Sequence, residues 1–108
     1  MKYQRLKKNA DFQRLFKNGK KAYSKDLTVI YTPCRDKTVM GIALSKKHGK
    51  AVVRNRIKRL IRAAFSNNFE MLCGNFSIVV LPKVKEEYSY ADIEKSLVCC
   101  FKAMDAKK

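Results

Sequence analysis

The residues of this sequence best suited to chemistry are cations, and they gather in one segment, 45–62. Eight of its eighteen residues are Lys or Arg, and no acidic residue occurs between Asp36 and Glu70. Guanidinium and ammonium groups bind phosphate oxygens, and guanidinium presents a fixed fork of N–H donors for them. A helix face that merely meets solvent normally mixes acidic and basic residues. The segment therefore predicts binding to a polyanion, with nucleic acid as the leading candidate.

The cations of this segment follow the period of a helix. An apolar stripe at helical spacing is expected to face the core, and it consists of Val53, Ile57, Leu60, Ile61 and Ala64. The opposite side carries polar residues at the same spacing, namely Asn55, Arg59, Arg62 and Ser66, with Arg56 and Lys58 beside them. A rigid helix of this kind spaces several cations at once, which suits the backbone of a nucleic acid.

The start of this helix offers a second place for phosphate. Lys46, Lys47 and Lys50 lie between the end of an expected strand and the first turn of the helix. Lysine ammonium groups, backbone N–H groups and the positive end of the helix would then converge on one phosphate. His48 stands alone among them, without a nearby Cys, Asp or second His, so we interpret it as a neutral surface residue.

Catalytic and metal-binding patterns are missing from the sequence. No Ser/His/Asp or Cys/His arrangement is evident, and Glu86 and Glu87 precede an expected helix whose N-terminus they suit. The four cysteines form no Cys-x-x-Cys motif, which favours reduced thiols over metal ligands; they are Cys34, Cys73, Cys99 and Cys100. We expect no catalytic residue, no metal site and no cofactor in this chain.

The elements that position the basic segment are indicated by hydrophobic periodicity. Helices are expected from Asn9 to about residue 17, over 50–69 and over 90–104. The apolar residues of the first helix are Phe12, Leu15 and Phe16. Strands are expected over 27–32, 39–45 and 76–81, and a short one over 20–23. We expect the strands over 27–32 and 39–45 to form an antiparallel hairpin, in which Leu27, Val29 and Tyr31 share one face. The order α-β-β-(β)-α-β-α predicts an α+β or α/β sandwich.

The size and net charge of the chain indicate a single domain that binds a polyanion. The 108 residues suit a single domain, and 25 Lys and Arg against 9 Asp and Glu give a net charge of +16 that calls for a polyanionic partner. No apolar N-terminal run and no stretch of about 18 apolar residues occurs, so a cytoplasmic location is expected. An anionic membrane surface would need exposed apolar residues opposite the cations, and a helix-turn-helix DNA-binding protein would need a helix before the basic one.

The run Lys-Ala-Val-Val-Arg-Asn-Arg-Ile-Lys-Arg-Leu-Ile-Arg at 50–62 resembles the Arg-Asn-Arg signature of the bacterial ribonuclease P protein family. Four other segments fall in the order that this family shows, so the resemblance covers nearly the whole chain: Asp11 to Phe16, the strand ending Val-Ile-Tyr31, Gly41 to Lys47, and Ser89-Tyr90. The resemblance implies an α+β fold, an α-β-β-β-α-β-α two-layer sandwich with a ribosomal-protein-like core. It also implies a left-handed βαβ crossover, whereas such crossovers are ordinarily right-handed.

The resemblance further implies a division of labour with RNA. In this family an RNA subunit with bound Mg²⁺ hydrolyses the phosphodiester at the 5′ end of precursor tRNA, and the protein aids binding of the 5′ leader. The residues implied to face the catalytic RNA are Lys46, Lys47, Lys50, Arg54, Asn55, Arg56, Lys58, Arg59 and Arg62. The residues implied to line the leader cleft are Phe12, Phe16, Val29 and Tyr31.

One position departs from the family. Many relatives place Arg or Lys directly after the last strand, where this chain has Leu81-Pro82-Lys83, so Lys83 is the candidate for that role. The resemblance predicts ribonuclease P RNA and precursor tRNA as partners, with no DNA and no membrane. The alternative is a ribosomal protein or RNA chaperone, which would bind RNA through the same helix without promoting leader cleavage.

Overall fold

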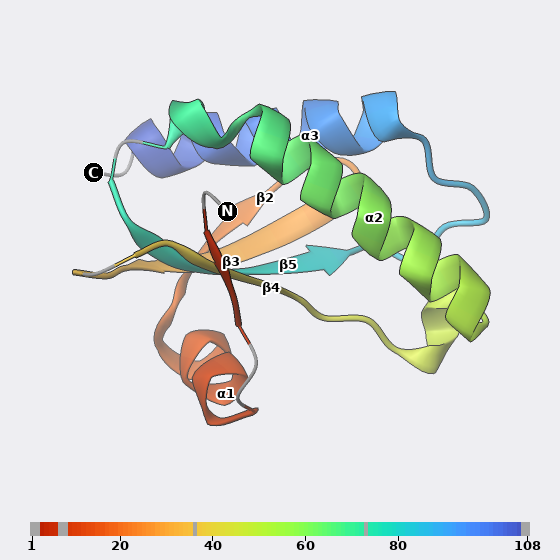
Figure 1. Cartoon of the computed structure of the whole chain (residues 1–108), viewed down its shortest axis with the longest axis horizontal. Coiled ribbons are helices and arrows are strands. Elements are labelled where there is room, and N and C mark those ends of the chain that lie inside the picture. Colours follow the sequence, from red (N-terminus) through yellow and green to blue (C-terminus); the bar gives the residue numbers. More distant parts are fainter. Residues whose placement is uncertain (1–2, 7–8, 36, 73, 107–108) are drawn as a thin grey trace.

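The computed structural model describes residues 3–6, 9–35, 37–72 and 74–106. A five-stranded sheet with the spatial order β1-β4-β5-β3-β2 forms its centre (Figure 1). The strands are β1 (Gln4–Arg5), β2 (Lys20–Tyr23), β3 (Leu27–Pro33), β4 (Val39–Ile42) and β5 (Phe76–Pro82). The helices are α1 (Asn9–Asn18), α2 (Ala51–Asn67) and α3 (Tyr90–Ala106), and short 3-10 helices precede and follow α2, namely η1 (Lys46–His48) and η2 (Phe69–Met71).

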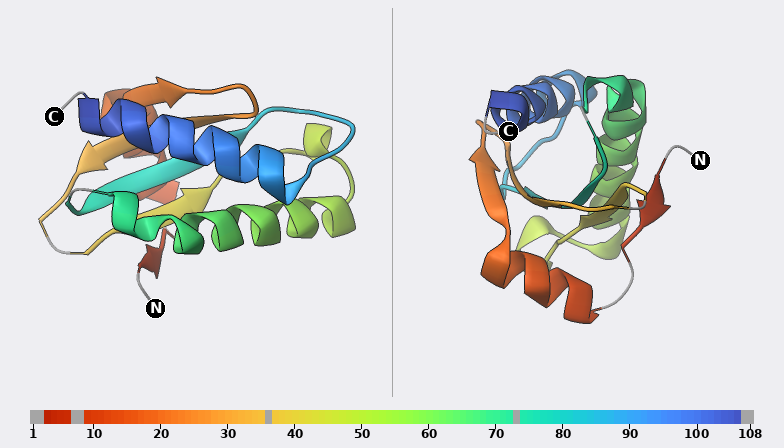
Figure 2. Two further views of the ribbon diagram at one scale, coloured as in Figure 1. Left: turned by 90° about the horizontal axis from the view of Figure 1, so that it is seen from above. Right: turned by 90° about the vertical axis from the view of Figure 1, so that its left-hand side faces the viewer.

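The expected order of helices and strands is confirmed, and the two-residue strand β1 is an addition to it. Helices α2 and α3 lie side by side on one face of the sheet, and α1 lies on the other face (Figures 1 and 2). Strand β3 is antiparallel to both β2 and β5, whereas β4 is parallel to β5 and to β1. The expected antiparallel hairpin of 27–32 and 39–45 is wrong, because β5 lies between β3 and β4 and pairs with both. The α+β sandwich of the sheet with α2 and α3 thus carries α1 as a smaller addition.

The connection between the two central parallel strands has the uncommon hand. Strand β4 leads through η1 into α2, which returns over the sheet before the chain enters β5 beside β4. Viewed from the helices, this path is left-handed (Figure 2). Most strand–helix–strand crossovers between parallel strands are right-handed because strand twist favours that path. The left-handed crossover implied by the resemblance is therefore present.

The larger core lies between the sheet and helices α2 and α3. Helix α2 contributes Ile57, Ile61, Ala64 and Phe65, each at most 1% exposed. The apolar stripe expected for this helix is confirmed over its middle, but Val53 is 39% exposed because it lies in the first turn. Phe65 was not expected in the stripe. Its ring meets Tyr3, Phe69 and Phe101 edge-on at centroid distances of 4.6, 5.9 and 5.6 Å.

Helix α3 closes this core with apolar side chains at helical spacing. Ile93, Leu97, Cys100, Phe101 and Met104 are all buried. Burial raises the pKa of the Cys100 thiol, and its Sγ points at the carbonyl oxygen of Ala22. Cys34, Cys99 and Cys100 are free thiols, and Cys73 lies outside the described residues. In the described part of the chain, no helix combines the length and apolar character that a bilayer span requires.

Helix α1 packs on the opposite face through a second, smaller core. Leu15 contacts Ile30 and Val79 there, and Phe12 packs against this cluster. Two glycines permit the close approach. A Cβ on Gly41 would lie 2.6 Å from the Phe12 ring, and a Cβ on Gly19 would lie 2.5 Å from Ile30 Cγ2. Both positions require the absence of a side chain for α1 to lie where it does.

We expect Gly41→Ala to destabilise the fold by about 1–3 kcal/mol, because the new methyl group must displace the Phe12 ring from a well-packed contact. Urea unfolding of the purified protein measures this loss. The matched control is the double variant Gly41→Ala, Phe12→Ala, in which the new methyl no longer meets the ring. The substitution at Gly41 should cost less in that background, and an equal cost in both backgrounds would show that Phe12 does not approach Gly41.

Candidate nucleic-acid interface

The cations of α2 fall into two groups once the helix is seated on the sheet. Arg54, Lys58 and Arg62 are half-buried along the side that meets β4, while Asn55 and Arg59 are exposed. Arg54, Asn55 and Lys58 line a hollow with Ile42 and Leu44. Together these side chains form a cationic edge directly above the end of β4.

Arg56 belongs to a different surface. It lines a hollow on the far side of α2 with Val53, Glu86, Glu87 and Tyr88, where the loop before α3 passes the helix. Two carboxylates beside a guanidinium reduce its attraction for phosphate. The structure therefore separates Arg56 from the cationic edge that the sequence placed it in.

The lysines expected at the start of the helix occupy a tight turn. Lys46, Lys47 and Lys50 are exposed around η1, and Ser45 Oγ accepts a hydrogen bond from the Lys47 N–H. Gly49 has φ +113°, a backbone conformation that side chains disfavour, and it ends η1 just before α2. Three ammonium groups are thus displayed within five residues at the N-terminal end of α2.

The His48 side chain holds this turn in place through two hydrogen bonds to the backbone. Its Nδ1 accepts a hydrogen bond from the Ser45 N–H at 3.1 Å, so the ring proton resides on Nε2, which donates to the Pro82 carbonyl oxygen at 2.7 Å. The expectation of a neutral histidine agrees with this pattern, but the residue ties the turn to the end of β5 rather than standing free. With both ring nitrogens bound to backbone, His48 is not available as a general base.

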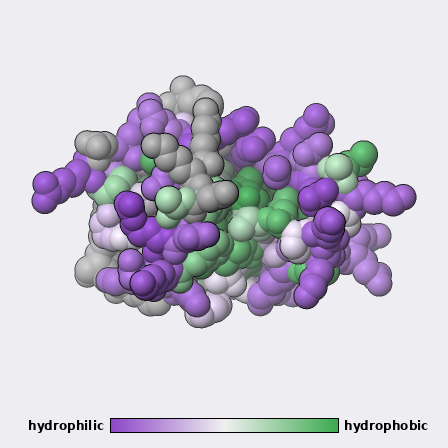
Figure 3. All heavy atoms as spheres, turned by 90° about the horizontal axis from the view of Figure 1, so that it is seen from below, coloured by the Kyte–Doolittle hydropathy of each residue, from purple (hydrophilic) through white to green (hydrophobic). Residues whose placement is uncertain are grey.

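An apolar groove opens beside the cationic edge. Phe12 and Phe16 of α1 face Ile42, Ala43 and Leu44 across a groove of about 350 Å³. Phe16 is 43% exposed, and Phe12 is half-buried. Figure 3 shows hydrophobic side chains gathered in a band across this face of the molecule, with hydrophilic side chains around them. Two aromatic rings at the wall of a solvent-open groove can stack on unpaired bases.

The two other residues expected in this cleft lie elsewhere, and the expectation must be corrected. Val29 and Tyr31 are 0% and 2% exposed, and both belong to the core under α2 and α3. Side chains alternate along a strand, so Ile30 is the residue of this stretch that faces α1. The buried site also raises the pKa of Tyr31, whose ring packs edge-on against Phe76.

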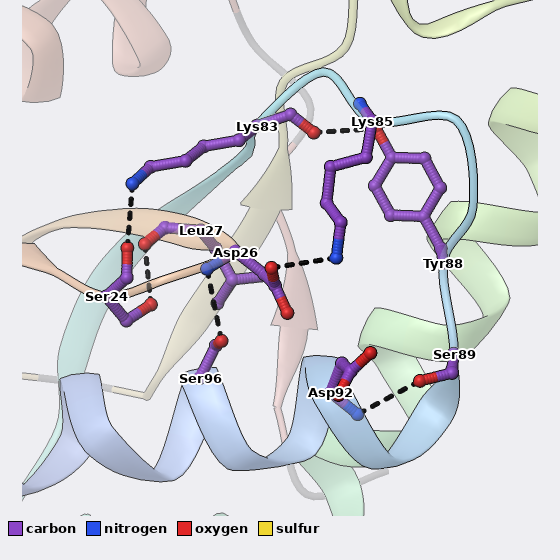
Figure 4. A network of polar contacts seen from close by, with 9 residues as sticks. All are labelled: Ser24, Asp26, Leu27, Lys83, Lys85, Tyr88, Ser89, Asp92 and Ser96. Atoms are coloured by element: carbon purple, nitrogen blue, oxygen red, sulfur yellow. Dashed lines mark hydrogen bonds and ion pairs between the residues drawn. The ribbon is translucent and has the colours of Figure 1, made fainter.

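Lys83 is exposed just after the end of β5 and is not among the residues that line the groove with Phe12 and Phe16. Its Nζ donates to the Ser24 carbonyl oxygen at 2.9 Å, and its backbone N–H bonds to Asp26. Figure 4 shows how the neighbouring loop is held: Lys85 pairs with the buried Asp26 at 2.8 Å. The hydrogen bond that Lys85 Nζ donates to the Asp26 carboxylate raises the pKa of Lys85. Lys83 thus stands on an anchored loop beside β2.

The groove and the cationic edge form one continuous surface. A hollow between them is lined by Phe12, Lys58 and Arg62, and also by Arg5 of β1. Ile42 borders all three hollows of this surface. An RNA strand whose bases enter the groove would therefore meet cations for its phosphates at the adjoining edge of α2.

Several residues of this surface are not indicated by the sequence pattern. The sequence pattern predicts a strand that includes Ile42, Ala43 and Leu44, but β4 ends at Ile42 and the next residues form the wall of the groove. Their position between a strand and the basic segment is the one feature of the sequence that places them near the cations. Arg5 had no signal of its own, since its role depends on β1 pairing with β4.

The acidic side chains Asp26 and Glu94 have their partners outside the groove and the cationic edge. Glu94 of α3 accepts hydrogen bonds from Asn68 and Tyr90, and these lower its pKa, that from Asn68 most. Among the described residues, no group of three or more His, Cys, Asp or Glu side chains is placed to hold a metal ion. The chemistry that this surface supports is the binding of phosphates and bases.

Comparison with known proteins places these features in a family. The sequence model described as Ribonuclease P matches residues 1–105. A ribonuclease P protein component from Bacillus velezensis is 40% identical over 104 residues, covering 94% of this chain and 89% of the relative. One from Clostridium kluyveri is 40% identical over 98 residues, covering 86% and 87%.

Solved structures agree with the sequence comparison. The ribonuclease P protein of Staphylococcus aureus superimposes with a TM-score of 0.82 at 34% identity, covering 93% of this chain and 94% of that protein. The protein from Thermotoga maritima also gives a TM-score of 0.82, at 30% identity, with 93% and 96% covered.

Proposed function

This chain belongs to the ribonuclease P protein family, and we propose that it is the protein subunit of a ribonuclease P ribonucleoprotein. Membership indicates a role in maturation of the tRNA 5′ end. The finer proposal is that the chain binds both the catalytic RNA and the 5′ leader of precursor tRNA. One observation carries it: an acid-free cationic edge on α2 adjoins an aromatic groove on the α1 face.

The cationic edge is proposed to bind the catalytic RNA. Structured RNA presents phosphates along its backbone, and each neutralised phosphate releases a condensed counterion. The residues proposed for this contact share an exposed or half-buried position on or just before α2: Lys46, Lys47, Lys50, Arg54, Asn55, Lys58, Arg59 and Arg62. Arg56 would contribute less, because Glu86 and Glu87 border its hollow.

The groove is proposed to receive the single-stranded leader. Bases of an unpaired strand stack on aromatic faces, and such stacking tolerates many base sequences. Phe12 and Phe16 supply the rings, and Ile42 to Leu44 supply the opposite wall. Val29 and Tyr31 have no part in this contact because they are buried in the other core.

The hydrolytic step is assigned to the RNA subunit with its bound Mg²⁺. This chain would assist by bringing the leader and the catalytic RNA together on one rigid surface, which lowers the entropy cost of assembling them. A ribosomal protein or RNA chaperone would need only the basic helix. The aromatic groove beside that helix favours the ribonuclease P proposal over this alternative.

The direct test is single-turnover cleavage of a precursor tRNA by a bacterial ribonuclease P RNA at low Mg²⁺, with and without this protein. We expect the protein to restore cleavage at the mature 5′ end, because its cations reduce repulsion between substrate and catalytic RNA. Tight, salt-sensitive RNA binding without faster cleavage would instead support the ribosomal or chaperone alternative.

Arg62→Ala should weaken binding to the catalytic RNA and reduce the slope of log affinity against log salt concentration by about one, because one phosphate contact is lost. Filter binding across a salt series measures both quantities. Arg35→Ala removes the same charge from the exposed loop after β3 and serves as the matched control. If both variants lose affinity equally, the effect reflects net charge and not a contact at α2.

Phe16→Ala should weaken binding of precursor tRNA to the assembled enzyme by about 1–3 kcal/mol, the worth of one stacked base. Affinity for the catalytic RNA alone should stay unchanged, since the ring lies in the groove and not on the cationic edge. Val84→Ala, which truncates another exposed apolar side chain, is the control. Equal losses in the two binding assays would contradict the separation of groove and edge.

A further inference from the structure

Helix α1 covers only part of the sheet face on which it lies. Strand register places Gly41, Val79 and Ile30 side by side in one row across β4, β5 and β3. Phe12 lies over Gly41, and Leu15 contacts Ile30 and Val79, so α1 runs across this row. The row is therefore closed to any ligand.

The next row on the same face is not covered in this way. Leu81 of β5 pairs with Thr28 of β3, and Thr28 pairs with Tyr23 of β2. Ala43 continues this row at its other end, because its N–H bonds to the Val80 carbonyl oxygen just beyond the last pair of β4 and β5. Three strand spacings of about 4.8 Å place Tyr23 roughly 14 Å from Ala43.

The row leads out of the aromatic groove. Ala43 is part of the groove wall opposite Phe16, and Leu81 and Thr28 are half-buried. Tyr23 ends the row with 66% of its surface exposed. Its neighbour Ala22 is 1% exposed and faces the main core, so strand alternation turns the Tyr23 side chain to the α1 face.

Cations accompany the exposed end of the row. Lys21 projects from the same face of β2, two residues before Tyr23. The Lys83 ammonium is held against the carbonyl oxygen of Ser24, the residue after Tyr23. An aromatic ring with cations beside it matches the composition of sites for single-stranded nucleic acid, where bases stack and phosphates are neutralised.

We propose that Tyr23 is a further base-stacking residue, which binds a leader nucleotide beyond those held between Phe16 and Ala43. The strand would leave the groove and cross Leu81 and Thr28, with Lys83 near its phosphates at the far end. This proposal rests on the proposed function, because it extends the same RNA path. It also gives Lys83 a place in leader binding, although Lys83 does not line the groove with Phe12 and Phe16.

The first experiment measures binding of precursor tRNA to the reconstituted holoenzyme while the leader is lengthened one nucleotide at a time. For Tyr23→Ala we expect wild-type affinity with short leaders and a loss of about 5- to 150-fold once the leader reaches the site. Tyr23→Phe keeps the ring and should bind as the wild type does. Phe16→Ala should lose affinity at shorter leader lengths than Tyr23→Ala.

A second experiment reports the contact directly. The chain contains no tryptophan, so Tyr23→Trp introduces a single indole fluorophore at the site. Stacking of a base on the indole should quench its emission only when the leader is long enough. Val84→Trp places the same fluorophore on the loop before α3, and its emission should not depend on leader length.

The outcomes separate this proposal from the proposed function. If Phe16→Ala responds to the leader while Tyr23→Ala and Tyr23→Trp do not, the function stands and the extended path is overturned. If no variant responds to any leader, the proposed leader binding itself fails. A loss for Tyr23→Ala that is equal for all leaders, or a change in oligomeric state, would assign Tyr23 to another contact and overturn the proposal.

Discussion

The burial of one side of α2 is the constraint on which the rest of the structure depends. Ile57, Ile61 and Phe65 are at most 1% exposed, and Phe65 is surrounded by aromatic rings from the N-terminal segment, η2 and α3. Rotating the helix would expose this surface at a cost of about 1.5–3 kcal/mol per side chain. The cations on its remaining sides consequently have fixed directions, which is what a phosphate-binding surface requires.

The position of α1 determines where the aromatic rings of the groove lie. The absence of side chains at Gly19 and Gly41 lets this helix lie close against the middle of the sheet, with Leu15 inward and Phe16 left exposed at its flank. The left-handed crossover places α2 over the side of the sheet that carries β4 and β1. Cations from one face and aromatic rings from the other therefore meet at the end of β4.

A net charge of +16 on 108 residues opposes folding, and the structure limits this cost by its arrangement of charges. The buried Asp26 pairs with Lys85, and Glu86 and Glu87 lie beside Arg56, so part of the positive charge is neutralised near the loop before α3. Along the cationic edge no such partner is supplied by residues 37–69, which contain no acid. The unneutralised charge is concentrated where an RNA would bind.

The sequence alone determined the elements and the class of partner, because helix and strand periods and an excess of cations are local properties. The buried faces of α2 and α3 followed from spacing, and resemblance added the crossover. The strand pairing did not follow from spacing, because β5, far away in the chain, lies between β3 and β4. Only the tertiary structure decided which sheet face α1 covers, which placed Ile30 rather than Val29 and Tyr31 beneath it. It also placed Arg56 and Arg54 on different sides of α2. The strand pairing put Ala43 and Tyr23 at the two ends of one row across the sheet. These outcomes depend on contacts between residues far apart in the chain, such as Phe12 and Gly41, which periodicity within one element does not contain.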